Sequence, residues 1–184
     1  MAISGPVCAG KSTLAAGLRS AMGARILTTR LLIADHLNRA PDELTRGELQ
    51  QAGERLDEER GGAWVAEEVA NLAQGSASLV VVDAVRNAQQ LAAMRAEATT
   101  FHVHLAANPV VLAARYAARS LASPQLEFPG FEELRANPTE AQVEGLADLA
   151  DLAIDTSRVG FDTTLAFVLQ RFNQGEAEEE RPPI

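Results

Sequence analysis

Near its beginning the chain carries the stretch Gly5-Pro6-Val7-Cys8-Ala9-Gly10-Lys11-Ser12. It fits the pattern G-x-x-x-x-G-K-[ST] of a P-loop, whose backbone N–H groups form an anion-binding nest at a helix N-terminus. Lys11 is the single lysine among the 16 lysines and arginines of the chain. A lysine ammonium is a compact charge on a flexible stem, whereas a guanidinium is a broad planar fork. Retention of one lysine at this position therefore predicts a site for a nucleoside triphosphate.

The P-loop residues have separate expected tasks. Lys11 is expected to contact the β- and γ-phosphates of ATP, and Thr13 to lie near the α-phosphate. Ser12 is the expected ligand of Mg²⁺. The set of nucleotide-binding residues predicted from the motif is Gly5, Ala9, Gly10, Lys11, Ser12 and Thr13. ATP and Mg²⁺ are therefore the expected cofactors.

Short apolar segments alternate with helical patterns along the chain. The run Leu79–Val82 is continuously apolar and mostly β-branched, which is typical of a strand buried on both faces in a parallel sheet. The alternation predicts the α/β class. Strands are expected over residues 2–4, 25–28, 79–83, 100–105 and 152–155. Helices are expected over residues 12–22, 29–38, 45–59, 64–74, 87–96, 109–121, 139–149 and 162–172.

One domain is expected over residues 1–173, followed by an acidic, disordered tail over 174–184. The net charge of −9 argues against sequence-independent binding of nucleic acid, which depends on basic patches. No apolar run reaches the roughly 18 residues that a membrane span needs, and the early P-loop leaves little room for a signal peptide. With Cys8 as the single cysteine, a cytoplasmic protein, monomer or homodimer, is expected.

Charged residues follow the predicted third strand and mark a second group of candidates. Asp83 ends the strand, as a Walker B carboxylate does, and would help to hold Mg²⁺. Arg86 follows at the edge of the sheet where ligands bind, and its guanidinium suits a second phosphate. Arg115 and Arg119 are spaced i, i+4 on one predicted helix, so both would face the transferring phosphates. Each of these residues also has a structural interpretation as a helix cap or a solvated surface charge.

Four stretches give the chain a resemblance to the P-loop kinases that include adenylate kinase, other nucleoside monophosphate kinases and dephospho-CoA kinase. They are the P-loop with its preceding strand, Thr45-Arg46-x-x-Leu49-Gln50-x-x-Gly53-x-x-Leu56, Asp83-x-x-Arg86, and Ala147–Asp155. The resemblance implies a three-layer fold with a five-stranded parallel sheet in the order 2-3-1-4-5. It also implies a helical acceptor-binding region at about 30–75 and a short lid at about 115–138.

The same resemblance implies roles for particular residues. Arg30 and Arg46 would lie near the acceptor phosphate together with Arg86, and Gln50 would hydrogen-bond an acceptor base. Arg115 and Arg119 would be arginines of the lid. Arg158, after the last strand, would stack on the adenine of ATP. The adenylate kinase form of the third stretch has an extra residue and a proline before its arginine, and this chain has neither.

The leading interpretation is a kinase that moves the γ-phosphoryl group of ATP to a nucleoside monophosphate or a similar nucleotide. The alternative is a kinase for a hydroxyl group of a small metabolite or antibiotic, in which Asp83 or Asp35 would accept the proton. A GTPase is disfavoured, because no second lysine exists to form an Asn-Lys-x-Asp guanine motif. A nucleotide-binding regulatory module without turnover is a further, weaker alternative.

Overall fold

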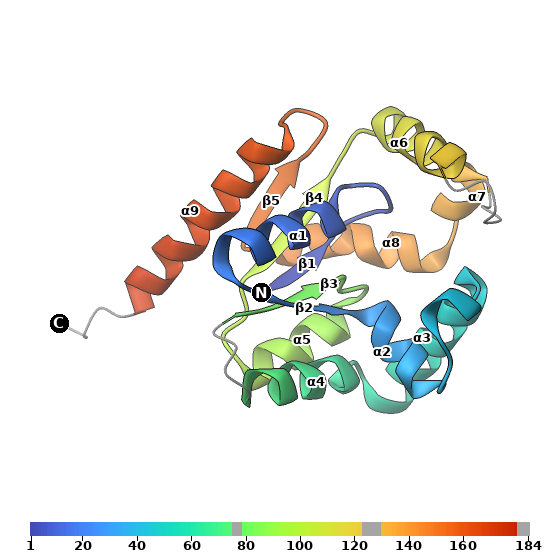
Figure 1. Cartoon of the computed structure of the whole chain (residues 1–184), viewed down its shortest axis with the longest axis horizontal. Helices are drawn as coiled ribbons and strands as arrows, with labels where there is room; N and C mark the ends of the chain where they lie inside the picture. The colour runs from blue at the N-terminus through green and yellow to red at the C-terminus, as the bar shows by residue number, and fades with distance from the viewer. Residues whose placement is uncertain (75–78, 123–129, 180–184) are drawn as a thin grey trace.

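A parallel β-sheet forms the centre of the molecule (Figure 1). The computed structural model describes residues 1–74, 79–122 and 130–179, and within these ranges the sheet has five strands. They are β1 (Ala2–Ser4), β2 (Arg25–Thr28), β3 (Val80–Asp83), β4 (His102–Ala106) and β5 (Leu152–Asp155). Their order is β2-β3-β1-β4-β5, and every neighbouring pair is parallel. The α/β class and the strand order 2-3-1-4-5 expected from the sequence are both confirmed.

Helices connect the strands and extend beyond them. The α-helices are α1 (Lys11–Met22), α2 (Thr29–His36), α3 (Arg46–Arg60), α4 (Ala63–Gln74), α5 (Ala88–Glu97), α6 (Pro109–Ala122), α7 (Phe131–Arg135), α8 (Pro138–Gly145) and α9 (Phe161–Glu179). Two short 3-10 helices, η1 (Pro41–Glu43) and η2 (Leu146–Leu149), complete the described part. Among the described residues, no helix has the length and hydropathy needed to cross a membrane.

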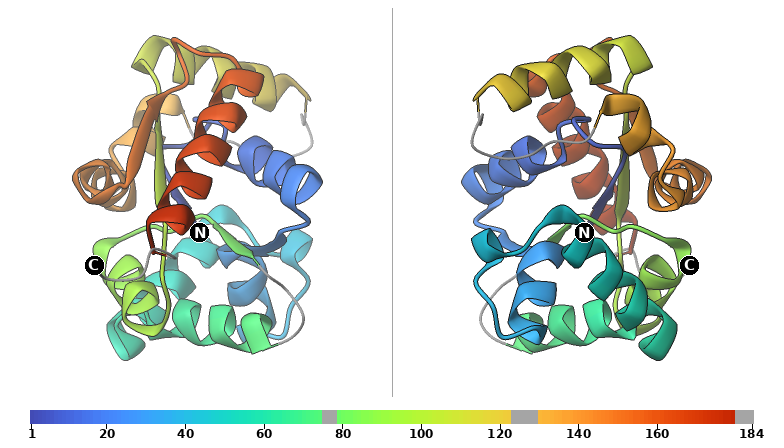
Figure 2. Two further views of the ribbon diagram at one scale, coloured as in Figure 1. Left: turned by 90° about the vertical axis from the view of Figure 1, so that its left-hand side faces the viewer. Right: turned by 90° about the vertical axis from the view of Figure 1, so that its right-hand side faces the viewer.

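The sheet lies between two layers of helices, as the side views show (Figure 2). On one face, Leu14 and Leu18 of α1 and Val168 of α9 pack with inward-facing residues of the strands. On the other face, the core contains residues of α4 and α5, including Val65 and Leu91. Because both faces are covered, strand β3 is buried on both sides, which explains its unbroken valine run.

Helix α3 begins with the capping box that the sequence predicts. The Thr45 side chain accepts a hydrogen bond from the Glu48 backbone N–H, and Glu48 Oε2 accepts one from the Thr45 backbone N–H at 2.8 Å. These two reciprocal bonds satisfy donors that a helix start would otherwise leave without partners. They explain why the long helix α3 begins at this point.

Several element ends differ from the sequence-based expectations by one or two residues, and three segments need separate comment. Helix α9 continues to Glu179, so residues 174–179 of the expected disordered tail are helical, while 180–184 lie outside the described residues. The helix expected over 139–149 begins at Pro138 and changes to the 3-10 helix η2 at Leu146. Within the segment expected to form the lid, residues 123–129 lie outside the described part, and the short α7 follows them.

Two histidines of β4 belong to the buried interior of the sheet. His102 and His104 point to the same side, and the Ser4 hydroxyl lies 2.7 Å from His102 Nε2 and 2.9 Å from His104 Nδ1. Burial above all, together with the neighbouring His102, lowers the pKa of His104 to about 4. The pair therefore stays neutral near pH 7 and links β1 to β4 by hydrogen bonds.

Candidate functional site

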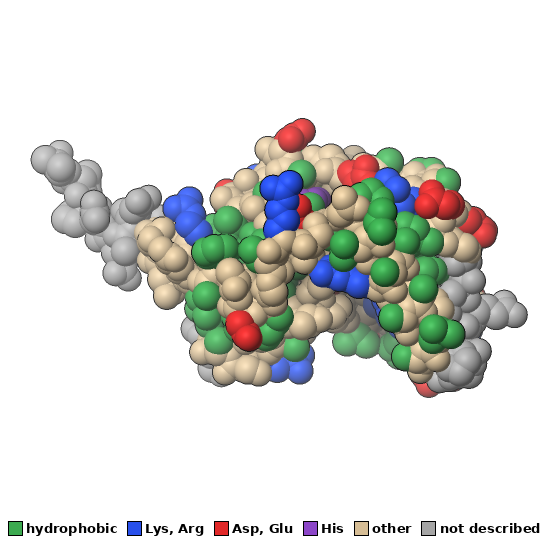
Figure 3. Space-filling view, turned by 90° about the horizontal axis from the view of Figure 1, so that it is seen from above, with side chains coloured by type: hydrophobic (Ala, Val, Ile, Leu, Met, Phe, Trp, Pro, Cys, Tyr) green, Lys and Arg blue, Asp and Glu red, His purple; other side chains and the backbone are tan. Residues whose placement is uncertain are grey.

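The carboxyl ends of three neighbouring strands bring the predicted site residues to one edge of the sheet. In the strand register, Thr28 of β2 lies beside Asp83 of β3, and Asp83 lies beside Ile3 of β1, directly before the P-loop. A cleft of about 2070 Å³ opens above this edge. Pockets for one small ligand usually measure roughly 300–1,000 Å³, so this cleft has room for two substrates. Seen from above, the surface is hollowed between two parts of the molecule, with Lys and Arg side chains in the hollow (Figure 3).

The P-loop backbone depends on two glycines. Gly5 has a φ of +136°, and a Cβ atom there would lie 2.1 Å from the Leu105 carbonyl oxygen. Gly10 has a φ of +99° and is the N-cap of α1, so its left-handed conformation directs the loop into the helix. Residues other than glycine rarely adopt these angles. The backbone angles therefore show why the tight loop requires glycine at both positions.

Lys11 begins α1 and is almost completely buried beneath the loop. Its Nζ atom donates to the carbonyl oxygens of Gly5 at 2.8 Å and Pro6 at 2.7 Å. Burial above all, together with the nearby Arg86 charge, lowers the pKa of Lys11 to about 7. Asp83 acts in the opposite direction and favours the ammonium form. The ammonium is thus held at the loop by carbonyl groups and lies where added negative charge would strongly favour it.

This low pKa predicts proton uptake when a triphosphate binds. The phosphate charges would raise the pKa of Lys11, so at about pH 8 the amine, mostly neutral in the free protein, becomes protonated on binding. Affinity for ATP should accordingly fall as the pH rises above about 7. Isothermal titration in two buffers of different ionisation enthalpy measures the uptake. Equal heats in both buffers would contradict the prediction, and the Lys11→Met variant should show no uptake from this group.

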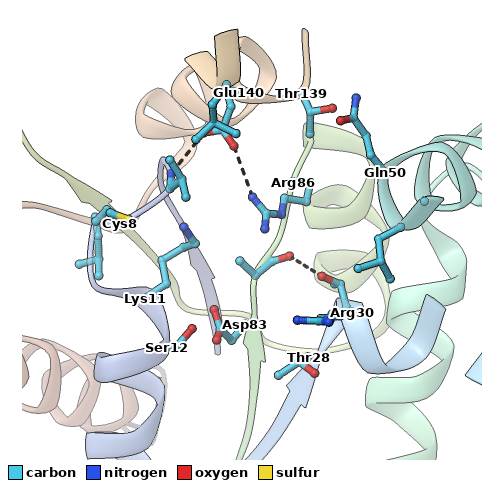
Figure 4. Close-up of a pocket in the computed structure, with 18 of the residues that line it drawn as sticks. Cys8, Lys11, Ser12, Thr28, Arg30, Gln50, Asp83, Arg86, Thr139 and Glu140 are labelled. Atoms are coloured by element: carbon cyan, nitrogen blue, oxygen red, sulfur yellow. Dashed lines mark hydrogen bonds and ion pairs between the residues drawn. The ribbon is translucent and has the colours of Figure 1, made fainter. Parts of the chain in front are cut away.

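Ser12 and Asp83 are the predicted metal ligands, and both line the cleft beside Lys11 (Figure 4). Mg²⁺ is usually held by one or two protein oxygens, with substrate phosphates and water completing the octahedron. One hydroxyl and one carboxylate fit that pattern. Within the described ranges, no group of three or more His, Cys, Asp or Glu side chains is arranged to hold a metal without a substrate. The residues present therefore suit a metal that arrives with a nucleotide.

Arg86 lies after β3 and lines the same cleft. Its backbone N–H donates to Gln90 Oε1 at 2.9 Å, and its Nη1 atom lies 3.9 Å from Glu140 Oε1. Glu140 also accepts a hydrogen bond from the Val7 backbone N–H at 3.2 Å, and its side chain is buried. Glu140 was not predicted from the sequence, where an acid three residues after the helix N-cap Asn137 indicates only an ordinary helix start.

Arg115 of α6 connects its helix to the P-loop and to the loop after β5. Its guanidinium donates to the Cys8 carbonyl oxygen at 3.3 Å, to Thr156 Oγ1 at 2.9 Å and to the Thr156 carbonyl oxygen at 2.8 Å. Arg119, one turn later, is exposed and lines the cleft. Thr156, which the sequence analysis did not identify, also donates to the Ala9 carbonyl oxygen at 3.1 Å. The two arginines thus lie on the P-loop side of the cleft, and their roles toward phosphate stay predictions.

The side of the cleft opposite the P-loop, called the acceptor side here because the sequence predicts that an acceptor binds there, is formed by α2, α3 and the start of α8. Arg30 is exposed, and its Nη2 atom donates to the Pro41 carbonyl oxygen at 2.6 Å. Gln50 and Asn137 form a reciprocal pair: Gln50 Nε2 donates to Asn137 Oδ1 at 3.0 Å, and Asn137 Nδ2 donates to Gln50 Oε1 at 2.7 Å. This pair joins α3 to α8 across the cleft. Arg46 begins α3, and its side chain lies outside the described part.

Asp57 organises the base of the acceptor side and was also missed by sequence analysis. It accepts hydrogen bonds from Trp64 Nε1 at 2.7 Å and Asn87 Nδ2 at 2.6 Å. Gln90 Nε2 donates to both carboxylate oxygens at 3.0 Å. Because Gln90 also accepts from the Arg86 backbone, this network links helices α3, α4 and α5 to the position of Arg86.

Two sequence candidates do not lie in the cleft. The Arg158 side chain is 84% exposed and forms an ion pair with Asp155 at 3.0 Å. Asp35, considered as a proton acceptor, is exposed on α2. Within the described chain, neither residue lines the cleft. A contact of Arg158 with adenine stays a prediction, whereas Asp83 is the carboxylate of the considered pair that reaches the cleft.

Comparisons with known proteins agree with this architecture. A family model described as an AAA domain matches residues 1–134. A search of curated protein sequences found no significant match. A sugar kinase from Janibacter sp. HTCC2649 matches with a TM-score of 0.59 and 15% identity, over 94% of this chain and 92% of that one.

Two further solved structures extend the likeness. A gluconokinase from Sinorhizobium meliloti 1021 matches with a TM-score of 0.55 and 19% identity, over 96% of this chain and 90% of that one. A deoxyadenosine kinase from M. mycoides, with bound dCTP, matches with a TM-score of 0.53 and 13% identity, over 94% and 98%. At these identities the likeness establishes the fold, which is that of the P-loop kinases and confirms the resemblance drawn from the sequence.

Proposed function

Because the chain belongs to the AAA domain family, whose model matches residues 1–134, we propose that it is an ATP- and Mg²⁺-dependent phosphotransferase. The observation that carries the proposal is the convergence of Lys11, Asp83 and Arg86 in one cleft with room for two substrates. A P-loop provides the donor end, and a second set of polar groups faces it. Such a two-ended cleft suits transfer of the γ-phosphoryl group from ATP to a small acceptor.

We propose a hydroxyl group of a small metabolite as the phosphoryl acceptor. The amide of Gln50, expected to bind an acceptor base, is engaged by Asn137 and Glu54, so a nucleobase would have to separate this pair. The gluconokinase and the deoxyadenosine kinase with the same fold are named for acceptors that carry hydroxyl groups. Both observations favour the alternative expected from the sequence, a kinase for a hydroxyl group of a small metabolite or antibiotic.

In the proposed reaction the protein positions the reactants and neutralises charge. The backbone N–H groups of the P-loop and the Lys11 ammonium would bind the β- and γ-phosphates, and Arg115 and Arg119 would approach from α6. Mg²⁺, held by Ser12 and Asp83, would offset the phosphate charge. The acceptor oxygen forms a bond to the γ-phosphorus as the bond to the β–γ bridging oxygen breaks. Asp83 would take the hydroxyl proton, directly or through water, and release it to solvent.

A nucleoside monophosphate is the second candidate acceptor. The observation in its favour is Arg86, which lies in the cleft three residues beyond Asp83, where its guanidinium suits a second phosphate. The phosphate of such an acceptor carries an oxygen that is already ionised near pH 7, so this reaction needs no protein base. A regulatory module that binds ATP without turnover uses the same donor end but leaves the acceptor end without a task.

An acceptor panel tests the proposal. We expect ADP release, measured in a coupled assay with Mg²⁺, to rise well above the rate with water when the matching acceptor is present. The panel includes sugars, hydroxy acids, deoxynucleosides and hydroxyl-bearing antibiotics, together with nucleoside monophosphates and dephospho-CoA. Stimulation by monophosphates alone would favour the second candidate. Tight ATP binding with no stimulated release by any acceptor class would support the regulatory module and sink the kinase proposal.

A further inference from the structure

Glu140 lies between the donor end and the acceptor end of the cleft (Figure 4). Its Oε2 atom accepts from the Val7 N–H of the P-loop at 3.2 Å, and its Oε1 atom lies 3.9 Å from Arg86 Nη1. The residue is 4% exposed and belongs to the first turn of α8. One carboxylate therefore faces both the loop that would bind ATP and the arginine that would bind an acceptor phosphate.

The ion pair changes what Arg86 can recognise. The Glu140 side chain is 6% exposed and that of Arg86 is 37% exposed, so solvent screens the carboxylate weakly. A phosphate bound to Arg86 would place negative charge next to this carboxylate. Like charges a few ångströms apart in a poorly solvated site repel strongly. A phosphate at Arg86, the role expected from the sequence, would therefore have to approach a carboxylate that already lies within ion-pair distance of the guanidinium.

The rest of the acceptor side also offers little free positive charge among its described residues. Arg30 is the other described cation there, and its guanidinium donates to the Pro41 carbonyl oxygen. Glu54, which also lines the cleft, accepts hydrogen bonds from Gln50 at 2.8 Å and from Thr139 at 3.3 Å. Carboxylates that line a cleft accept hydrogen bonds from hydroxyl groups, and amides both accept and donate them. Neither group requires a charged partner. The acceptor side favours an uncharged, hydroxyl-rich acceptor.

We propose that Glu140 determines acceptor specificity: its carboxylate pairs with Arg86 and excludes a second phosphate, so the acceptor is an uncharged polyhydroxyl compound. The inference rests on the proposed function and narrows its substrate class. In this proposal Glu140 discriminates by repelling phosphate-bearing acceptors rather than by attracting the uncharged acceptor. Arg86 serves in this arrangement to hold Glu140 at the acceptor site.

The test measures binding of inorganic phosphate and does not depend on turnover. The wild-type chain is first saturated with Mg²⁺ and a non-hydrolysable ATP analogue, so that the P-loop is occupied, and phosphate is then titrated by calorimetry. Glu140→Gln retains an oxygen that can accept from Val7 but removes the charge next to Arg86. We expect this variant to bind phosphate at least about tenfold more tightly than the wild type, as loss of one close charge repulsion implies.

Two controls locate the effect. Glu144→Gln removes the same charge from the same helix, but Glu144 is 61% exposed and pairs with Arg135 at 3.8 Å, so phosphate binding should not change. Adding Arg86→Gln to Glu140→Gln should abolish the gain. If Glu140→Gln does not fold, Glu140→Asp, which withdraws the charge by one methylene, should give a smaller gain of the same sign.

Equal phosphate affinity in the wild type and in a folded Glu140 variant would overturn the proposal. A gain that persists without Arg86 would overturn it as well, because the effect would then arise elsewhere. Failure of the proposed function shows itself separately, as the absence of acceptor-stimulated ADP release in the acceptor panel, and failure of the donor site shows itself at the first step, as failure to bind the ATP analogue. Phosphate discrimination by Glu140 and ATP binding by the P-loop are thus tested by different measurements on the same samples.

Discussion

Replacement of Lys11 by methionine should lower the rate of phosphoryl transfer by about 10³-fold, with the fold retained. The Lys11 ammonium is held at the P-loop by the Gly5 and Pro6 carbonyl oxygens, and no other lysine exists in the chain to replace it. Because transferring phosphates carry their charge on oxygens next to this group, its loss removes transition-state stabilisation of about 4 kcal/mol. The measurement is acceptor-stimulated ADP release.

Stability should not explain that loss. Burial already lowers the pKa of Lys11 to about 7, which means that the folded protein disfavours its charge. A methionine of similar length places an apolar group in the same buried position, so we expect unchanged or slightly higher resistance to urea. Arg19→Met, an exposed change on the same helix, serves as the control and should retain turnover. Full activity in Lys11→Met would contradict the assignment of the donor site.

Asp83→Asn should lower turnover by about 10²- to 10³-fold. The carboxylate ends β3 next to the P-loop strand, lines the cleft and would both hold Mg²⁺ and receive the acceptor proton. The asparagine side chain has the same shape as aspartate but lacks the negative charge that metal binding and proton transfer both require. Measuring turnover over a range of Mg²⁺ concentrations separates metal binding from proton transfer, because a defect in metal binding alone is partly rescued at high Mg²⁺.

Asp35→Asn is the matched control for Asp83→Asn. It makes the same chemical change on an exposed carboxylate of α2 that does not line the cleft within the described residues. Turnover should stay within about twofold of the wild type, since exposed substitutions of this kind change stability little. Loss of activity in Asp35→Asn equal to that in Asp83→Asn would contradict the choice of Asp83 as the catalytic carboxylate.

Local patterns predicted the fold well, and the physical reasons are visible in particular elements. The valine run of β3 is buried on both faces, and the Thr45–Glu48 capping box forms at the start of α3. The P-loop glycines have the positive φ angles that the motif requires. Each of these features depends on residues within a few positions of one another, so a sequence pattern contains the whole interaction. The parallel order of the strands then follows from the family resemblance that these patterns support.

The acceptor side could not be predicted in the same way, because its interactions join distant segments. Glu140 contacts Val7 across 133 positions, and Gln50 contacts Asn137 across 87 positions. No spacing rule connects such residues. The roles of Gln50 toward an acceptor base and of Arg86 toward a phosphate stay predictions, and the structure adds the contacts of Gln50 with Asn137 and of Arg86 with Glu140, which no local pattern indicates.

The most direct test of phosphoryl transfer at this cleft is to identify the product after incubation with MgATP and the acceptor panel. ³¹P NMR and mass spectrometry together show whether an acceptor gains a phosphoryl group as a phosphate ester while ATP is converted to ADP. We predict a phosphate monoester on a hydroxyl group of an uncharged acceptor, formed by the wild type and lost in Lys11→Met. Conversion of ATP to ADP and free phosphate alone, at the same rate with and without every acceptor, would contradict the proposed reaction.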